Sequence, residues 1–124
     1  TLPEKYISKE EKKYYAEMKS RLPEMPTREM NGFEVISPAE TWDKIINQEI
    51  PQLYPVFPWG LFGIGKPDLD LAVNTWEHGI DEARQKNHIS WHQDAIFCAR
   101  MGLSEEAEKI TTMREAITYI ESHT

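Results

Sequence analysis

Between Ile50 and Gly65 the chain runs for sixteen residues without a formal charge, and this stretch limits what the protein can fold into. Most of its residues are apolar or aromatic, so it belongs in a core. It is not a membrane span, because a bilayer needs about 20 consecutive apolar residues. Five residues that interrupt helices punctuate it: Pro51, Pro55, Pro58, Gly60 and Gly63. We expect a short helix over residues 55–62, apolar on every side and enclosed by protein.

Three further helices are indicated after this stretch. Over residues 67–84 apolar side chains recur with the 3.6-residue period, which predicts a helix buried on one face. Five consecutive apolar residues at 95–99 predict a second enclosed helix, over residues 91–101. Gly102 ends that helix, and Ser104 caps a last one over residues 105–122, whose apolar residues again form one stripe.

The N-terminal third carries a different set of signals. Ser8 and Glu11 have the spacing of a capping box and predict a helix to about Leu22. Its apolar stripe consists of Tyr14, Tyr15, Met18 and Leu22. Proline, Asn and Gly punctuation predicts an extended connector over residues 23–35. The sequence Ser-Pro-Ala-Glu at its end predicts a short helix over residues 37–46.

The expected fold is all-α, because enclosed and one-sided helices alternate along the chain. The segments 55–62 and 91–101 are expected to be enclosed, and 67–84 and 105–122 to face water on one side. Concentric rings of helices require this alternation, so the pattern favours helical hairpins that form part of an (α/α) toroid, with an N-terminal helix and an extended connector before them. A helical-hairpin solenoid or an irregular bundle would produce a similar alternation.

Length and charge exclude several classes of protein. A chain of 124 residues builds one modest core, so we expect a single domain over residues 1–124. Fourteen basic and 21 acidic residues give a net charge of −7, which argues against binding to nucleic acid or to an anionic membrane surface. The single Cys98 should be an inert core thiol. Because the chain starts at Thr1 without a signal sequence, we expect it to be a fragment of a longer protein.

Five residues are candidates for contact with a ligand. Asp94 is flanked by Trp91 and His92 in the first turn of an expected helix, where the helix dipole lowers a carboxyl pKa. This suits a hydrogen-bonding or base-orienting role, although Asp94 could simply complement the helix end. Trp91 could stack on a sugar ring or pack as a core residue. If both inner helices point the same way, Gln52 and Tyr54 lie on the same rim as these three.

No metal site or cofactor is expected. His88 and His92 are four residues apart, but the helix is expected to start between them and no third ligand is suitably spaced. The glycines near Gly60 lack the Lys-Ser/Thr ending of a phosphate-binding loop.

Three stretches together resemble part of a known enzyme domain. They are Leu22-Pro23 with Gly32 and Ser37-Pro38-Ala39-Glu40; Gln52-Leu53-Tyr54-Pro55-Val56-Phe57-Pro58; and Ser90-Trp91-His92-Gln93-Asp94 running into Ala99-Arg100-Met101-Gly102-Leu103 and Glu106-Ala107. In content and order they are similar to the later part of the (α/α)6-barrel domain of family 95 glycoside hydrolases, which act on α-L-fucosides and some α-L-galactosides, and of uncharacterised bacterial homologues. The resemblance spans roughly residues 15–110.

The resemblance implies a carbohydrate ligand and a periplasmic or extracellular location. The segment of the family that matches residues 52–58 is usually rich in His, and its possible equivalents here are Gln52 and Tyr54. The general acid of the family lies upstream of the matching region, and the Asn and Asp that prepare the water lie outside it. The resemblance therefore implies substrate-contacting residues, no catalytic residue, and the remaining segments of a parent domain as partners.

Two functions follow as hypotheses. In the first, the chain is a segment of a glycoside hydrolase, inactive by itself and prone to form a homodimer through exposed apolar faces. In the second, it is a self-contained helical module that binds a partner protein through residues 54–62. Convergence of Gln52, Tyr54, Trp91, His92 and Asp94 on one concave surface would favour the first hypothesis.

Overall fold

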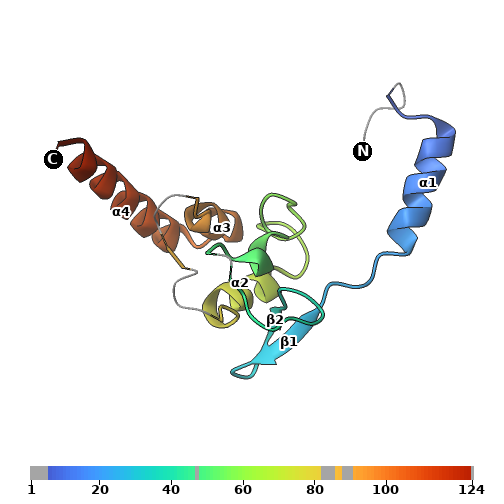
Figure 1. Ribbon diagram of the computed structural model, residues 1–124, viewed down its shortest axis with the longest axis horizontal. Coiled ribbons are helices and arrows are strands. Elements are labelled where there is room, and N and C mark those ends of the chain that lie inside the picture. Colours follow the sequence, from blue (N-terminus) through green and yellow to red (C-terminus); the bar gives the residue numbers. More distant parts are fainter. Residues whose placement is uncertain (1–5, 47, 82–85, 88–90, 124) are drawn as a thin grey trace.

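The computed structural model describes residues 6–46, 48–81, 86–87 and 91–123. The chain is rich in helix and includes a small two-stranded sheet. The elements are, in order, α1 (Lys9–Ser20), β1 (Thr27–Met30), β2 (Phe33–Ile36), the 3-10 helix η2 (Pro51–Leu53), α2 (Leu69–His78), α3 (Asp94–Met101) and α4 (Ser104–His123). The hairpin, η2, α2 and α3 form a central body, from which α1 and α4 project at opposite ends (Figure 1).

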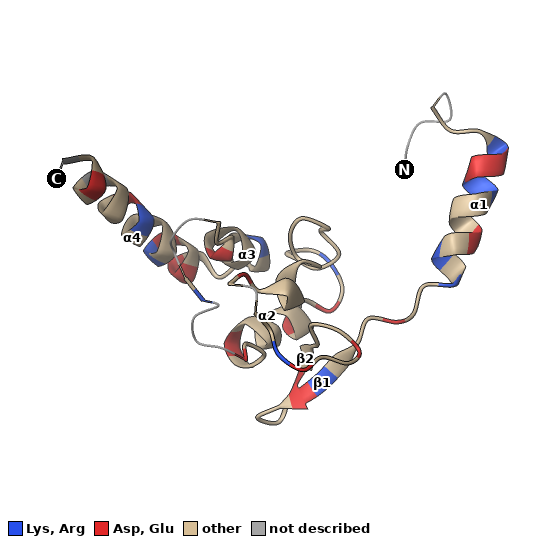
Figure 2. Ribbon diagram, in the orientation of Figure 1, with Lys and Arg blue, Asp and Glu red and all other residues tan. Residues whose placement is uncertain are grey.

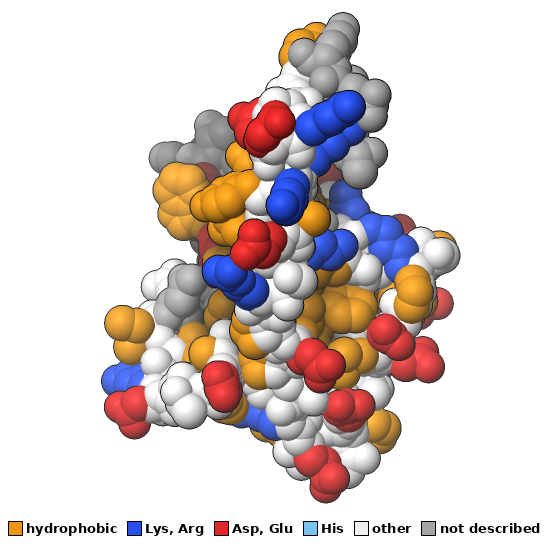
Figure 3. Space-filling view, turned by 90° about the vertical axis from the view of Figure 1, so that its right-hand side faces the viewer, with side chains coloured by type: hydrophobic (Ala, Val, Ile, Leu, Met, Phe, Trp, Pro, Cys, Tyr) orange, Lys and Arg blue, Asp and Glu red, His pale blue; other side chains and the backbone are white. Residues whose placement is uncertain are grey.

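Helix α1 confirms the capping box predicted from the sequence. The Ser8 hydroxyl accepts from the Glu11 backbone N–H at 3.1 Å, and the Glu11 carboxylate accepts from the Ser8 N–H at 2.8 Å. The helix stands away from the body and carries both signs of charge (Figure 2). It has no buried residue, and its predicted stripe, including Met18 at 48% exposure, faces water. Seen from the α1 end, hydrophobic side chains lie exposed among lysines and glutamates (Figure 3).

The predicted helix-rich character is confirmed, but part of the connector predicted over residues 23–35 forms a β-hairpin, so the chain is not strictly all-α. Strands β1 and β2 pair antiparallel, with Thr27 opposite Ile36 and Met30 opposite Phe33. The two residues between them, Asn31 and Gly32, have φ of 54° and 82°. Asn and Gly tolerate these left-handed conformations, and a two-residue turn of this kind matches the twist of paired strands.

The helix predicted over residues 55–62 is also absent. One turn of 3-10 helix at η2 is followed by turns, in which the N–H of Leu61 bonds the carbonyl of Pro55. Closely spaced prolines remove the N–H donors that a helix needs, and Gly60 has a φ of 63°. Val56 and Phe62 are buried, but Trp59 and Leu61 are 64% and 55% exposed. The stretch contributes to the core without being enclosed.

The short helix predicted over residues 37–46 does not form either, and the segment consists of bends and irregular backbone. Helix α2 is shorter than the predicted 67–84, and residues 82–85 lie outside the described residues. Trp76 belongs to the apolar stripe predicted over residues 67–84, and at 6% exposure it lies in the core, as that stripe predicts. The Ile36 N–H donates to the Thr75 hydroxyl at 2.9 Å, so a buried bond ties β2 to α2.

Helices α3 and α4 form a hairpin around Gly102. The predicted helix over residues 91–101 begins at Asp94, and Ile96 is 42% exposed, so α3 is not enclosed. Its other face supplies Phe97, Cys98 and Met101 to the core. Gly102 takes a φ of 83°, and the Leu103 N–H bonds the Cys98 carbonyl at 2.9 Å. The predicted alternation of enclosed and one-sided helices is therefore not observed.

Only the first part of α4 packs against the body. Ala107 and Ile110 are half-buried against the core, whereas Met113 and Ile120 are 43% and 58% exposed. No helix in the described ranges is long and apolar enough to cross a membrane.

Replacing Thr75 with Val should destabilise the protein by about 1–3 kcal/mol, because it leaves the buried Ile36 N–H without an acceptor. Urea denaturation followed by circular dichroism measures this free energy of unfolding. Thr111→Val is the matched control: its hydroxyl bonds the Ala107 carbonyl on an exposed helix face, and its loss should change stability by less than about 0.5 kcal/mol. Equal effects of the two substitutions would show that the hairpin does not depend on Thr75.

Candidate functional site

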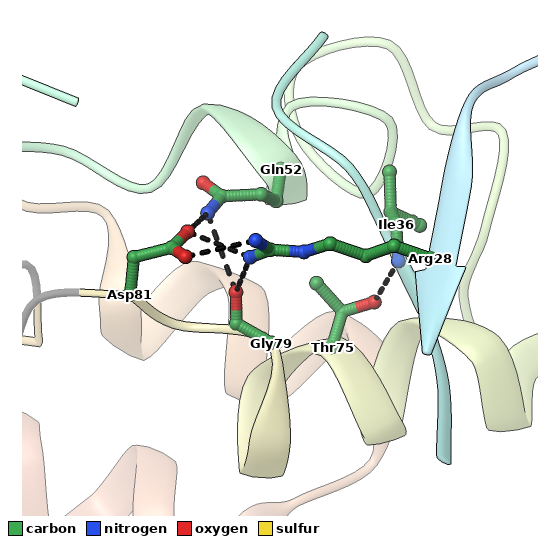
Figure 4. Close-up of polar contacts among 6 residues, drawn as sticks. All are labelled: Arg28, Ile36, Gln52, Thr75, Gly79 and Asp81. Carbon is green, nitrogen blue, oxygen red and sulfur yellow. Dashed lines mark hydrogen bonds and ion pairs between the residues drawn. The ribbon is translucent and has the colours of Figure 1, made fainter. Parts of the chain in front are cut away.

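Gln52 lies inside the body, 1% exposed. Its amide donates to the Gly79 carbonyl at 3.3 Å and to Asp81 Oδ2 at 3.2 Å (Figure 4). The Arg28 guanidinium donates to both Asp81 carboxylate oxygens, at 2.8 and 2.7 Å, and to the Gly79 carbonyl at 3.1 Å. These groups join β1, η2 and the end of α2. Gln52 is thus separated from the other predicted contact residues.

Tyr54 lies half-buried just after η2. Its hydroxyl donates to Glu49 Oε2 at 2.5 Å, and its ring meets Trp59 edge-on with 6.3 Å between the centroids. The bond to Glu49 brings Tyr54 to the wall of a pocket that the sequence did not reveal.

This pocket has a volume of about 290 Å³ and is lined by Ile46, Gln48, Glu49, Trp91 and His92. We call it the Trp91 pocket. The Trp91 side chain is 81% exposed, so the alternative of a packing role is wrong. A flat indole, an amide, a carboxylate and an imidazole thus surround one opening.

His92 and Asp94 are buried next to each other, 6% and 1% exposed. His92 Nδ1 lies 3.6 Å from Asp94 Oδ1, and within the described part of the chain neither atom has a hydrogen-bond partner. The other carboxylate oxygen of Asp94 accepts from the Asn87 N–H at 2.7 Å. Asp94 also lines a second pocket of about 170 Å³, the Asp94 pocket, whose other lining residues are Trp76, Lys86, Asn87, Glu106, Lys109 and Ile110.

The predicted lowering of the Asp94 pKa is wrong. Burial raises the pKa of this carboxyl and outweighs the Asn87 N–H and His92, which both lower it. The helix dipole argument fails because the carboxylate has lost its contact with water. Lys86 lines the same pocket, and burial lowers the pKa of its ammonium, which lies 4.2 Å from the centre of the Trp76 ring.

Cys98 is a core thiol, as predicted. It is fully buried and unpaired, and burial, together with Asp94 and Glu106, raises its pKa to about 12. The thiolate is therefore not available near neutral pH. Among the described residues, no group of three or more His, Cys, Asp or Glu side chains is arranged to hold a metal ion, and His88 lies outside them.

The structure brings together part of the predicted set. Trp91 and His92 share one pocket, Tyr54 reaches its wall through Glu49, and Asp94 lies beside His92. Gln52 belongs to the separate cluster around Asp81. The five residues do not form one concave surface. Sequence reasoning missed Gln48 and Glu49, because they stand in an irregular segment without periodicity or a cap.

We expect Asp94 to lower the stability of the folded protein as pH rises. Because its folded pKa lies above the ordinary value of about 3.9, the folded state binds this proton more tightly than the unfolded state. The contribution of Asp94 to the free energy of unfolding should be greatest below about pH 4. This contribution should be lost as pH rises through the pKa of Asp94 in the folded state. Urea denaturation between pH 3.5 and 8 measures this trend.

Asp94→Asn should remove that part of the pH dependence, since the amide does not ionise. Asp70→Asn, at an exposed position on α2, is the control and should leave the trend as in the parent protein. A parent protein whose stability did not depend on Asp94 between pH 4 and 8 would contradict the raised pKa.

Comparisons of the chain with models of known protein families, with curated proteins and with solved structures find no match. The function is therefore inferred from the geometry of the two pockets together with the resemblance in the sequence.

Proposed function

We propose that this chain is a segment of a glycoside hydrolase that acts on α-linked sugars of the fucoside or galactoside kind, and that it contributes residues that contact the substrate. The observation that carries the proposal is the exposed Trp91 at the edge of a pocket that also has three polar lining residues, Gln48, Glu49 and His92, beside the apolar Ile46.

The chemistry of these walls suits a pyranose. One face of a sugar ring presents C–H groups that pack against an indole, while its edge presents hydroxyls that need both donors and acceptors. The Gln48 amide supplies both, and the Glu49 carboxylate supplies an acceptor. The bond from the Tyr54 hydroxyl to Glu49 Oε2 holds that carboxylate in place.

The pocket by itself lacks the machinery for hydrolysis. Inversion requires two carboxyl groups about 6.5–9.5 Å apart, with one acting as acid and the other as base. Among the described residues that line the Trp91 pocket, Glu49 is the only acid. The proposal therefore assigns this chain a role in binding and leaves the catalytic pair to other segments of the parent domain.

Exposed apolar faces support the view that this chain belongs to a larger domain. The Tyr14, Tyr15 and Met18 face of α1 and the Met113 and Ile120 face of α4 are exposed, although such stripes normally pack against protein. In the proposed (α/α) toroid, α3 and α4 are one helical hairpin and neighbouring hairpins cover these faces. The isolated chain could instead cover them by forming a homodimer.

A protein-interaction module is the second candidate, because the loop after η2 exposes three large apolar residues. Trp59, Leu61 and Ile64 are 64%, 55% and 67% exposed. Exposed clusters of this kind are typical of surfaces that bind protein partners. In that case the Trp91 pocket would bind no sugar.

Titration with methyl α-L-fucoside and methyl α-galactoside, followed by nitrogen-15 NMR, tests the first candidate. We expect saturable shifts at Trp91 and Glu49, and a Trp91→Ala variant that binds at least tenfold more weakly, a loss of about 1.4 kcal/mol. Trp59→Ala, at an exposed indole outside the pocket lining, should bind as the parent does. Saturable binding that Trp91→Ala leaves intact, or no binding of either glycoside, would refute the proposal.

The isolated chain should release no sugar from aryl α-fucosides or aryl α-galactosides, because the pocket lacks a carboxyl pair. Release of the aryl alcohol, followed by absorbance, measures this. Turnover near ordinary enzyme rates, about 1 s⁻¹ or faster, would show that the chain carries a complete active site.

A further inference from the structure

The His92 and Asp94 pair links two of the pockets in the described part of the chain. His92 lines the Trp91 pocket, and Asp94 lines the Asp94 pocket. The two side chains are two residues apart at the start of α3, and both are more than nine-tenths buried. This polar pair therefore connects the Trp91 pocket with the charged residues of the Asp94 pocket, which the proposed function does not use.

The geometry around Asp94 leaves one oxygen for His92. Asp94 Oδ2 accepts from the Asn87 N–H at 2.7 Å, while Oδ1 has no hydrogen-bond partner among the described residues and lies 3.6 Å from His92 Nδ1. This separation is longer than a hydrogen bond. Hydrogen bonds of this kind are often long in the free protein and shorten when ligand binds. Each atom is buried, and leaving both without a partner costs free energy.

We propose that Asp94 is the positioning residue of His92: its carboxylate keeps the proton on Nδ1 and so presents Nε2 as a hydrogen-bond acceptor for a sugar hydroxyl in the Trp91 pocket. This inference rests on the proposed function of that pocket. The physical reason is that the partner of one ring nitrogen decides which nitrogen carries the proton. A carboxylate accepts only, so the nitrogen facing it must donate.

The charged groups around the pair are compatible with this arrangement. On the side of His92, Glu49 lines the same pocket, and Arg114 donates from α4 to the His92 backbone carbonyl at 2.6 Å, a bond that does not involve the ring nitrogens. On the side of Asp94, three charged residues, Lys86, Lys109 and Glu106, line the Asp94 pocket together with the carboxylate. Lys86 favours the ionised carboxylate that the pair requires.

Asp94→Asn gives a sharp test, because Asn87 fixes how the new amide is oriented. The Asn87 N–H needs an acceptor, so the amide oxygen faces it and the amide NH₂ faces His92 Nδ1. The imidazole must then accept at Nδ1 and carry its proton on Nε2. Asp94→Asn preserves the shape of the side chain at position 94 but moves the proton of the His92 ring from Nδ1 to Nε2. A merely structural role for Asp94 would not produce this change of tautomer.

Long-range proton to nitrogen-15 correlation spectra at pH 8.5, where histidine side chains are neutral, report the tautomer of each ring. Comparison with a His92→Gln variant assigns the His92 signals. We expect proton on Nδ1 in the parent chain and on Nε2 in Asp94→Asn, while Asp70→Asn matches the parent. A parent ring with its proton on Nε2, or the same tautomer in the parent and in Asp94→Asn, would overturn the inference.

Sugar affinity gives the second readout. In Asp94→Asn, Nε2 changes from acceptor to donor, so binding of the methyl glycosides should weaken about tenfold although the variant remains folded by circular dichroism. Unchanged affinity in Asp94→Asn would overturn the positioning role. If the parent binds neither glycoside, the proposed function fails, whereas the tautomer spectra still decide whether Asp94 controls His92.

Discussion

The attachment of the β-hairpin to α2 and η2 is the interaction on which the rest of the structure depends. The Arg28 guanidinium and the Gln52 amide share two acceptors just after α2, the Gly79 carbonyl and the Asp81 carboxylate. A buried bond from the Ile36 N–H to the Thr75 hydroxyl adds a second point of contact. A two-stranded hairpin is only marginally stable in water by itself. These bonds hold Ile36 over the core, where it packs with Leu53, Trp76 and Phe97 of three other segments. The anchor thereby joins β2 to η2, the two elements that flank the segment from which Ile46, Gln48 and Glu49 line the Trp91 pocket.

The structure also buries a polar pair, His92 and Asp94, although its hydrophobic core is modest. Burial raises the pKa of Asp94, so its charge opposes folding near neutral pH, yet the side chain points inward beside His92. Arrangements that disfavour folding but place titratable groups together are typical of binding and catalytic sites. This supports a ligand role for the region around Trp91, whereas Gln52, buried with Asp81, serves the framework.

Short-range signals predicted the ends of elements well. The capping box at Ser8 and the glycine at Gly102 are satisfied by groups within a few residues, so the sequence specifies them. Asn31-Gly32 was an equally local signal, but together with the nearby prolines it was interpreted as connector punctuation and not as the turn of a hairpin. The helix predicted over residues 55–62 failed because hydrophobicity shows that a segment is buried, not which backbone conformation buries it. Closely spaced prolines decided that question.

By itself the sequence determined the helices with strong periodicity or caps, the core places of Trp76 and Cys98, and the grouping of Trp91, His92 and Asp94 near one helix start. Only the tertiary structure decided which of these side chains meet. It separated Gln52 from the group, added Glu49, and buried Asp94 deeply enough to reverse the expected direction of its pKa shift. The physical reason is that capping and periodicity act within a few residues, whereas desolvation and pocket walls depend on segments that come together only when the chain folds.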